Sequence, residues 1–199
     1  MFYPVSVKKI IDNLKLLPGI GEKSAERLAF SMLNFDKDNL TNFSDAILEL
    51  RDKICKCSNC FNISDGDKCI ICSDNKRDKS QIMVVETAKD VVSFEKLGVY
   101  SGTYHVLGGL ISPIDGINPE DVTIKELIVR LKNNNITEVI LALKPSIEGE
   151  TTMQYINKLL HNCSVKISRI ASGIPVGADM EYIDALTLEL ALEERKNIS

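Results

Sequence analysis

Four cysteines form two CxxC pairs, Cys57/Cys60 and Cys69/Cys72, with eight residues between the pairs. Thiolates are favoured zinc ligands, and four of them can close a tetrahedral shell around one ion. Such a shell has no open position for catalysis, so the metal is expected to be structural. It would stabilise residues 55–79, which contain too few large apolar residues for a core of their own. The spacing therefore predicts a four-cysteine zinc knuckle with one Zn²⁺ per chain.

Paired cysteines have two other common uses. Disulfides are disfavoured in a reducing compartment, and a redox CxxC typically opens a helix of a βαβ unit, which neither pair is expected to do. Cys55 is a further thiol near the quartet, and its spacing to Cys57 favours a place outside the metal shell. Cys163 is expected to be a small buried hydrophobe.

A second group with chemical potential surrounds the turn Pro18–Gly21, which joins two segments of helical apolar spacing, 6–16 and 22–34. Gly19 and Gly21 let the backbone turn sharply and approach another surface closely. The helix that follows begins with free N–H groups and the positive end of its dipole, which together attract a phosphate.

Lys23 and Arg27 follow this turn at i,i+4 spacing, so they lie on one face of the second helix. The whole unit looks like a helix-hairpin-helix, a motif that grips a nucleic-acid backbone without reading bases. We therefore expect Gly19, Gly21, Lys23 and Arg27 to contact DNA. A single hairpin of this kind is a weak binder.

The elements that must position these residues fall into segments of different character. Ser6 is a candidate N-cap of the first helix. A third apolar stripe completes a helical domain over 1–54; its members are Leu40, Phe43, Ile47, Leu50 and Ile54. The knuckle follows over 55–79, an α/β domain over 80–172 and a C-terminal segment over 173–199.

From residue 81 onward, strand patterns alternate with helix patterns, which predicts an α/β domain with a mainly parallel sheet. Strands are expected over 82–85, 104–107, 139–143 and 165–170, and helices over 88–97, 123–134, 151–161 and 179–195. The overall fold class is therefore α+β and multidomain.

Glu86 ends the first of these strands, and Asp90 follows four residues later. Functional groups gather at the carboxyl ends of strands in open α/β sheets, and this arrangement has the look of a Toprim domain. Catalytic Toprim domains also need an Asp-x-Asp after a later strand to hold magnesium. Here that strand is followed by Lys144 instead. The alternative is a metal held by Glu86 with Glu148 and Glu150.

A purely structural explanation of Glu86 and Asp90 is that acidic side chains stabilise a helix N-terminus. The remaining candidates for chemistry are weaker. His105 and His161 stand alone, and His105, in an apolar strand, is expected to be structural. The glycine-rich stretches at 108–109 and 173–177 match no phosphate-binding fingerprint.

The net charge of −4 argues against a generally basic nucleic-acid binder. The charge is uneven, however: residues 1–80 carry +1 and residues 81–199 carry −5. DNA contacts are therefore expected in the N-terminal part, and basic protein partners at the acidic part. No run is long and apolar enough for a membrane span, and no signal peptide is recognised, so a cytoplasmic location is expected.

Together these features resemble the RecR family of recombination mediators over nearly the whole chain. The resemblance rests on the order and spacing of segments 17–30, 57–72, 84–90, 104–117 and 173–184. It implies a non-enzymatic DNA-repair protein that binds single- and double-stranded DNA without sequence preference. It also implies dimers and ring-shaped tetramers that form a clamp, with assembly through the N-terminal helices and the C-terminal segment.

The resemblance further implies action with RecO and RecF to help load RecA at gaps. By position, Lys23 and Arg27 would contact DNA, and Glu86 and Asp90 would belong to the RecO-facing surface. Lys144 departs from the family, whose members commonly have Asn there. Two other hypotheses stay open: an active Toprim nuclease or primase-like enzyme, and a purely structural zinc protein without DNA contact.

Overall fold

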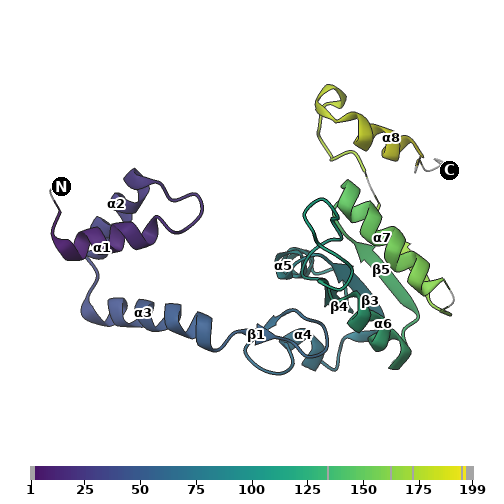
Figure 1. Ribbon diagram of the computed structural model, residues 1–199, viewed down its shortest axis with the longest axis horizontal. Helices are drawn as coiled ribbons and strands as arrows, with labels where there is room; N and C mark the ends of the chain where they lie inside the picture. Colours follow the sequence, from purple (N-terminus) through teal and green to yellow (C-terminus); the bar gives the residue numbers. More distant parts are fainter. Residues whose placement is uncertain (1–2, 134, 162, 172, 194, 196–199) are drawn as a thin grey trace. The chain divides into compact units, whose positions relative to one another are not determined.

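The computed structural model describes residues 3–133, 135–161, 163–171, 173–193 and 195. The chain divides into two compact units, Met1–Ile54 and Cys55–Ser199 (Figure 1). The finer boundaries expected after residues 79 and 172 stay predictions.

The first unit contains the two helices that flank the Pro-Gly turn, α1 (Val5–Leu14) and α2 (Glu22–Met32). They pack on each other around three buried residues, Ile11, Ala25 and Ala29. The prediction that Ser6 caps α1 is wrong. Pro4 occupies the N-cap, and its carbonyl accepts a bond from the Lys8 N–H at 3.0 Å.

The third helix, α3 (Lys37–Asp52), begins at Asp36, whose carboxylate accepts a hydrogen bond from the Asn39 N–H at 2.7 Å. The predicted apolar stripe is present, but it does not face a core of this chain. Phe43 is 46% exposed and Ile47 is 54% exposed, and no residue of α3 is buried. A soluble helix normally covers such a stripe, so its exposure distinguishes α3 from α1 and α2.

The second unit opens with the cysteine-rich segment. A short antiparallel pair, β1 (Cys55–Lys56) and β2 (Ile63–Ser64), is followed by the one-turn helix α4 (Ile70–Ser73). The second CxxC pair begins at the start of a helix, because Cys69 is the N-cap of α4. This turn lies between β2 and the next strand and is not the crossover helix of a βαβ unit.

The expected parallel sheet is confirmed. It has four strands in the order β4-β3-β5-β6, and each adjacent pair is parallel. The strands are β3 (Asp78–Val85), β4 (Gly102–Val106), β5 (Glu138–Ala142) and β6 (Lys166–Arg169). In the register, Val84 pairs with His105 on one side and with Leu141 on the other. The carboxyl ends of β3 and β5 therefore meet at one edge of the sheet.

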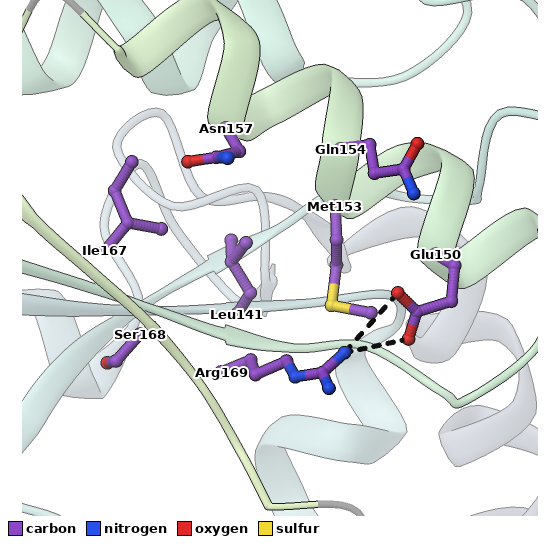
Figure 2. Close-up of a pocket in the computed structure, with 8 residues that line it drawn as sticks. All are labelled: Leu141, Glu150, Met153, Gln154, Asn157, Ile167, Ser168 and Arg169. Carbon is purple, nitrogen blue, oxygen red and sulfur yellow. Dashed lines mark hydrogen bonds and ion pairs between the residues drawn. The ribbon is translucent and has the colours of Figure 1, made fainter. Parts of the chain in front are cut away.

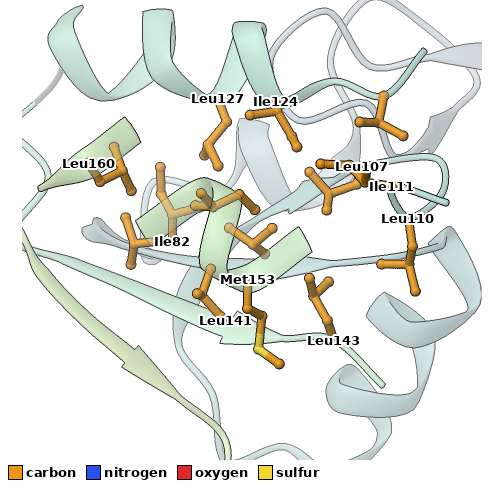
Figure 3. Close-up of a cluster of buried hydrophobic side chains, with 14 residues drawn as sticks. Ile82, Leu107, Leu110, Ile111, Ile124, Leu127, Leu141, Leu143, Met153 and Leu160 are labelled. Carbon is orange, nitrogen blue, oxygen red and sulfur yellow. The ribbon is translucent and has the colours of Figure 1, made fainter. Parts of the chain in front are cut away.

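Alternate residues of β3 build two cores because successive side chains of a strand point to opposite faces. Ile82 and Val84 lie in one cluster with residues of α6 (Ile124–Asn133) and α7 (Ile147–Leu160) (Figure 3). Met83 and Val85 lie in the other cluster, with α5 (Ala88–Leu97) and three of the four quartet cysteines. The knuckle thus shares a core with the sheet.

Helix boundaries depend on local caps. Helix α5 spans the predicted residues and ends at Gly98, whose φ of 66° is left-handed. Helix α7 begins four residues earlier than predicted because the Ser146 hydroxyl accepts the Gly149 N–H at 3.2 Å. In place of one helix over 179–195, the structure has a 3₁₀ turn, Met180–Tyr182, and α8 (Ala185–Glu193). None of the helices within the described residues is long and apolar enough to cross a bilayer.

Candidate functional site

The four predicted metal ligands are brought together. The Sγ atoms of Cys57, Cys60, Cys69 and Cys72 all lie within 4.8 Å of one another, and Cys60 Sγ is 3.5 Å from Cys69 Sγ. A tetrahedral zinc site with bonds of about 2.3 Å would place its sulfurs about 3.8 Å apart. The cluster therefore has the donor set and the size to hold one metal ion of this kind.

Two of the four sulfurs accept hydrogen bonds from N–H groups, which favours their thiolate form. The Cys69 N–H donates to Cys57 Sγ at 3.3 Å, and the Asn59 amide donates to Cys72 Sγ at the same distance. A hydrogen bond from the Cys60 thiol, together with the Asn59 amide, lowers the pKa of Cys72, whereas the Cys72 contact and burial raise the pKa of Cys60. The opposite directions of the two shifts reflect one shared contact, in which a thiol donates to a neighbouring sulfur.

The other two cysteines lie outside the cluster. Cys55 is exposed, and its Sγ is 3.3 Å from the Gly66 carbonyl oxygen and 3.4 Å from that of Ser64. Cys163 is half-buried against the core that contains α6 and α7. Both placements agree with the sequence interpretation of four ligands rather than five or six.

The hairpin turn has the backbone that the glycines predict. Gly19 has a φ of 80°, a left-handed conformation that favours glycine. Gly21 is the N-cap of α2, and no side chain among the described residues caps the start of this helix. An uncapped helix N-terminus after a glycine turn is a place where a phosphate can dock.

Lys23 and Arg27 are both exposed on α2, and within the described residues neither forms an ion pair. Glu22, in the first turn of the same helix, is instead paired with Lys15 of the segment that follows α1. The neighbouring carboxylate is therefore balanced from within the hairpin, which leaves the charges of Lys23 and Arg27 available to an external anion.

At the carboxyl end of β3 the two predicted acids have different surroundings. Asp90 closes a capping box: its Oδ2 accepts the Thr87 N–H at 2.7 Å and the Thr87 hydroxyl at 2.9 Å. Glu86 lies just before this box, and its Oε2 is 3.9 Å from Lys144 Nζ. Stabilisation of a helix N-terminus thus accounts for Asp90, whereas the Glu86 carboxylate faces Lys144, just beyond the end of β5.

Lys144 stands where a catalytic Toprim domain would need carboxylates. The remaining acids nearby are engaged elsewhere: Glu148 Oε2 accepts the Ser146 hydroxyl at 2.8 Å, and this bond lowers the Glu148 pKa. Glu150 pairs with Arg169 at 3.3 Å on the rim of a hollow of about 240 Å³ beside β6 (Figure 2). Among the described residues, only the cysteine quartet gathers three or more metal-binding side chains.

Two residues of the second unit that form buried or paired contacts were not identified from the sequence. Arg169, at the end of β6, neutralises Glu150. Arg130 of α6 is buried, with 9% of its surface exposed, and its guanidinium reaches the edge strand β4. A signal for Arg130 was present, because it lies three residues after the buried Leu127 and therefore on the apolar side of its helix.

Three family models match consecutive parts of the chain. The RecR helix-hairpin-helix matches residues 7–51, a Toprim domain matches 80–171, and the RecR C-terminal region matches 173–196. The two RecR-specific matches flank the Toprim match in the order that the sequence features indicated. With the hairpin, the cysteine cluster and the parallel sheet in place, this chain belongs to the RecR family of DNA-repair and recombination proteins.

Proposed function

We propose that this protein is a non-enzymatic recombination mediator that forms a ring-like clamp on DNA and helps RecO and RecF to load RecA at gaps. The observation that carries the proposal is the hairpin, in which Lys23 and Arg27 are exposed in the first two turns of a helix whose N-terminus has no side-chain cap. These groups suit DNA phosphates and make no demand on base sequence.

The proposal accounts for the acidic composition of the chain. One hairpin contributes a few salt-sensitive phosphate contacts. Several hairpins linked in a dimer or tetramer raise the effective concentration of each contact, so that weak sites sum to useful avidity. The exposed apolar stripe of α3, centred on Phe43 and Ile47, supports assembly from several copies because it has no cover within the described chain.

The contacts at the carboxyl ends of β3 and β5 also support a mediator role. Lys144 Nζ supplies the positive charge facing Glu86, so a carboxylate that could help hold magnesium has a protein cation opposite it. We propose that Glu86 and Asp90 belong instead to a surface for a basic partner, RecO. Asp90 would act there mainly by holding the start of α5, because its Oδ2 is engaged in the capping box.

We propose that the cysteine cluster holds Zn²⁺. Cys57, Cys60, Cys69 and Cys72 would be its ligands, and the ion would supply no reactive position because four thiolates complete the shell. Its contribution would be to tie β1, β2 and α4 to the sheet. We also propose a cytoplasmic location, where the thiols stay reduced, and four functional segments over 1–54, 55–79, 80–172 and 173–199.

The experiment that tests the DNA-binding role is a comparison of Lys23→Ala/Arg27→Ala with the wild type in fluorescence anisotropy titrations. Labelled duplexes and single strands of unrelated sequence are used over a range of salt. We expect the variant to bind each of them at least about tenfold more weakly. We also expect a lower salt slope, by roughly 0.9 for each lost contact to duplex phosphate.

Lys37→Ala/Arg51→Ala is the matched control because it removes the same two kinds of charge from α3. It should bind like the wild type. Equal DNA affinity of the hairpin variant and this control at low salt would remove the hairpin from the mechanism. The enzymatic alternative needs its own test, an assay for magnesium-dependent cleavage or synthesis of DNA. Robust activity that Glu86→Ala abolishes would overturn the mediator proposal.

A further inference from the structure

A second basic feature lies in the second unit, apart from the hairpin. A hollow of about 220 Å³ opens between the cysteine knuckle, the edge of the sheet and α6. A second hollow adjoins it and shares Asn59 and Arg130; its lining also includes Lys125 and the carboxylate Glu126. The polar and ionisable groups lining the first hollow are Asn59, Lys68, Cys72, Lys79, Thr103 and Arg130.

Arg130 is fixed in the wall of the hollow. Its Nη1 donates to the Tyr104 carbonyl at 2.5 Å, and its Nη2 donates to the Thr103 hydroxyl at 2.9 Å. Both partners belong to β4, so the guanidinium is held by the edge of the sheet. Burial lowers the Arg130 pKa, whereas the cysteine thiolates raise it. A positive charge held in surroundings of low polarity attracts an anion more strongly than the same charge in water.

Two further cations stand at the same hollow. Lys68 and Lys79 are exposed, and Lys79 Nζ contacts only a neutral group in the bonds described, the Asn75 amide oxygen at 3.2 Å. Among the described residues that line the hollow, none is an Asp or Glu. Three cations therefore line this hollow, and one of them, Arg130, belongs to residues 81–199, which carry a net charge of −5.

The one lining group that can become anionic is the Cys72 thiol, and its sulfur already accepts a hydrogen bond from the Asn59 amide. As a ligand in a Zn²⁺-loaded quartet, this sulfur would belong to a centre whose four thiolates exceed the charge of the ion by two. Lys68, Lys79 and Arg130 carry three positive charges, so positive charge stays in excess at the hollow, with Thr103 as a hydroxyl in its wall.

We propose that this hollow is a binding site for a single phosphate group. Its volume is below the roughly 300–1,000 Å³ of pockets that enclose drug-sized ligands, so it suits one tetrahedral oxyanion rather than a whole nucleotide. Lysine ammonium groups and a fixed guanidinium are the donors that proteins use for phosphate. The phosphate could come from a nucleic-acid backbone or from a free phosphate compound.

The test is a titration of the full-length, zinc-loaded protein with inorganic phosphate, monitored by isothermal titration calorimetry at low salt. We expect Lys68→Ala/Lys79→Ala to weaken phosphate binding roughly tenfold. Lys96→Ala/Lys158→Ala is the matched control, because it removes two exposed lysines away from the hollow. It should bind phosphate like the wild type.

Arg130→Met removes the fixed charge and keeps a long side chain, and we expect it to weaken phosphate binding at least as much. Because Arg130 is buried and its loss also removes bonds between α6 and β4, the exposed double-lysine variant is the decisive one. Equal phosphate affinity of that variant, the control and the wild type would overturn the site, as would the absence of phosphate binding to the wild type.

The source of the phosphate is distinguished by a second titration, with single-stranded oligothymidylate, in the Lys23→Ala/Arg27→Ala background. Residual oligonucleotide binding that Lys68→Ala/Lys79→Ala removes would identify the nucleic-acid backbone as the source. Phosphate binding that depends on the two lysines, without such oligonucleotide binding, would identify a free phosphate compound. Neither result depends on the hairpin, so a failure of the proposed DNA contact and a failure of this site are distinguishable.

Discussion

His105 has the character of a buried, uncharged histidine. Its Nε2 is 2.8 Å from the Thr123 carbonyl oxygen and 3.0 Å from the Thr123 hydroxyl, which itself bonds to the Val106 carbonyl. Because a carbonyl only accepts, Nε2 carries the proton. Nδ1 is buried and has no hydrogen-bond partner among the described residues. A proton added at Nδ1 would therefore create an unsatisfied buried charge, so burial lowers the His105 pKa to about 4.

The low pKa of His105 predicts that the folded protein becomes less stable in acid. In the unfolded chain His105 takes up a proton near its ordinary pKa of about 6.5, whereas in the folded chain it resists until about pH 4. Stability is therefore lost as the pH falls from about 6.5 to 4, by about 3 kcal/mol in total. Urea unfolding at several pH values should show that loss in the wild type and a smaller one in His105→Gln. Parallel pH curves for the two proteins would contradict the assignment.

At the scale of elements, the knuckle and the sheet depend on each other. The Val106 N–H at the end of β4 donates to the Cys60 carbonyl at 2.8 Å, and Cys57, Cys60 and Cys69 share a core with Met83 and Val85. The cysteine segment thus covers part of an edge strand, a place where unpaired backbone groups would otherwise be exposed. We therefore expect a metal ion held by the four sulfurs to add to the order that this packing gives the segment.

We predict that removal of the metal loosens the knuckle first. The purified protein should contain one zinc per chain, and Cys57→Ser or a strong chelator should remove it. Amide hydrogen exchange over residues 55–73 should then accelerate, while exchange in α1 and α2 stays unchanged. Cys55→Ser is the matched control, because Cys55 lies outside the cluster. Unchanged exchange after complete metal removal would show that the segment is held by packing alone.

The first turn of α7 is a second element that depends on one residue, because it has no room for a side chain at Gly149. Gly149 lies in its first turn, and a Cβ added there would be 2.0 Å from the Lys144 carbonyl oxygen. We predict that Gly149→Ala lowers the free energy of unfolding by about 2–3 kcal/mol, because backbone must move. Gly173→Ala, where an added Cβ would meet no atom within 4 Å, should stay near the wild type. Chemical denaturation of both variants checks this, and equal stability would mean that the turn adjusts freely.

At the scale of the whole molecule, the apolar stripe of α3 is a surface that the first unit leaves exposed. Leu40, Phe43, Ile47 and Leu50 are between 41% and 68% exposed. They recur at three- and four-residue spacing along one face of the helix. Contiguous exposed apolar surface of this kind marks an interaction site.

We predict that Phe43→Glu/Ile47→Glu lowers the oligomeric state, because two carboxylates would have to be buried with the stripe. Light scattering of the purified protein with and without DNA measures the change. Thr41→Glu/Asn42→Glu adds the same charge away from the centre of the stripe and should keep the wild-type assembly. A wild-type protein that stays monomeric under all conditions would contradict the clamp.

Local patterns in the sequence were enough for several features. The CxxC spacing selects four of the six cysteines, the glycines at 19 and 21 predict the hairpin turn, and Gly98 ends α5 as expected. The alternation of strand and helix patterns after residue 81 predicts the parallel sheet. Each of these depends on residues close together in the chain, where spacing alone limits the geometry.

Other features needed the tertiary structure because they join residues far apart in the chain. Only the folded sheet brings Lys144 to Glu86, Arg169 to Glu150, and Arg130 to the edge of β4. The exposure of the α3 stripe likewise depends on how the first unit packs, since its core of Ile11, Ala25 and Ala29 includes no residue of α3. The sequence by itself determined most of the elements and the four cysteines that cluster. The tertiary structure decided which charges meet, because strand order and helix packing set those distances.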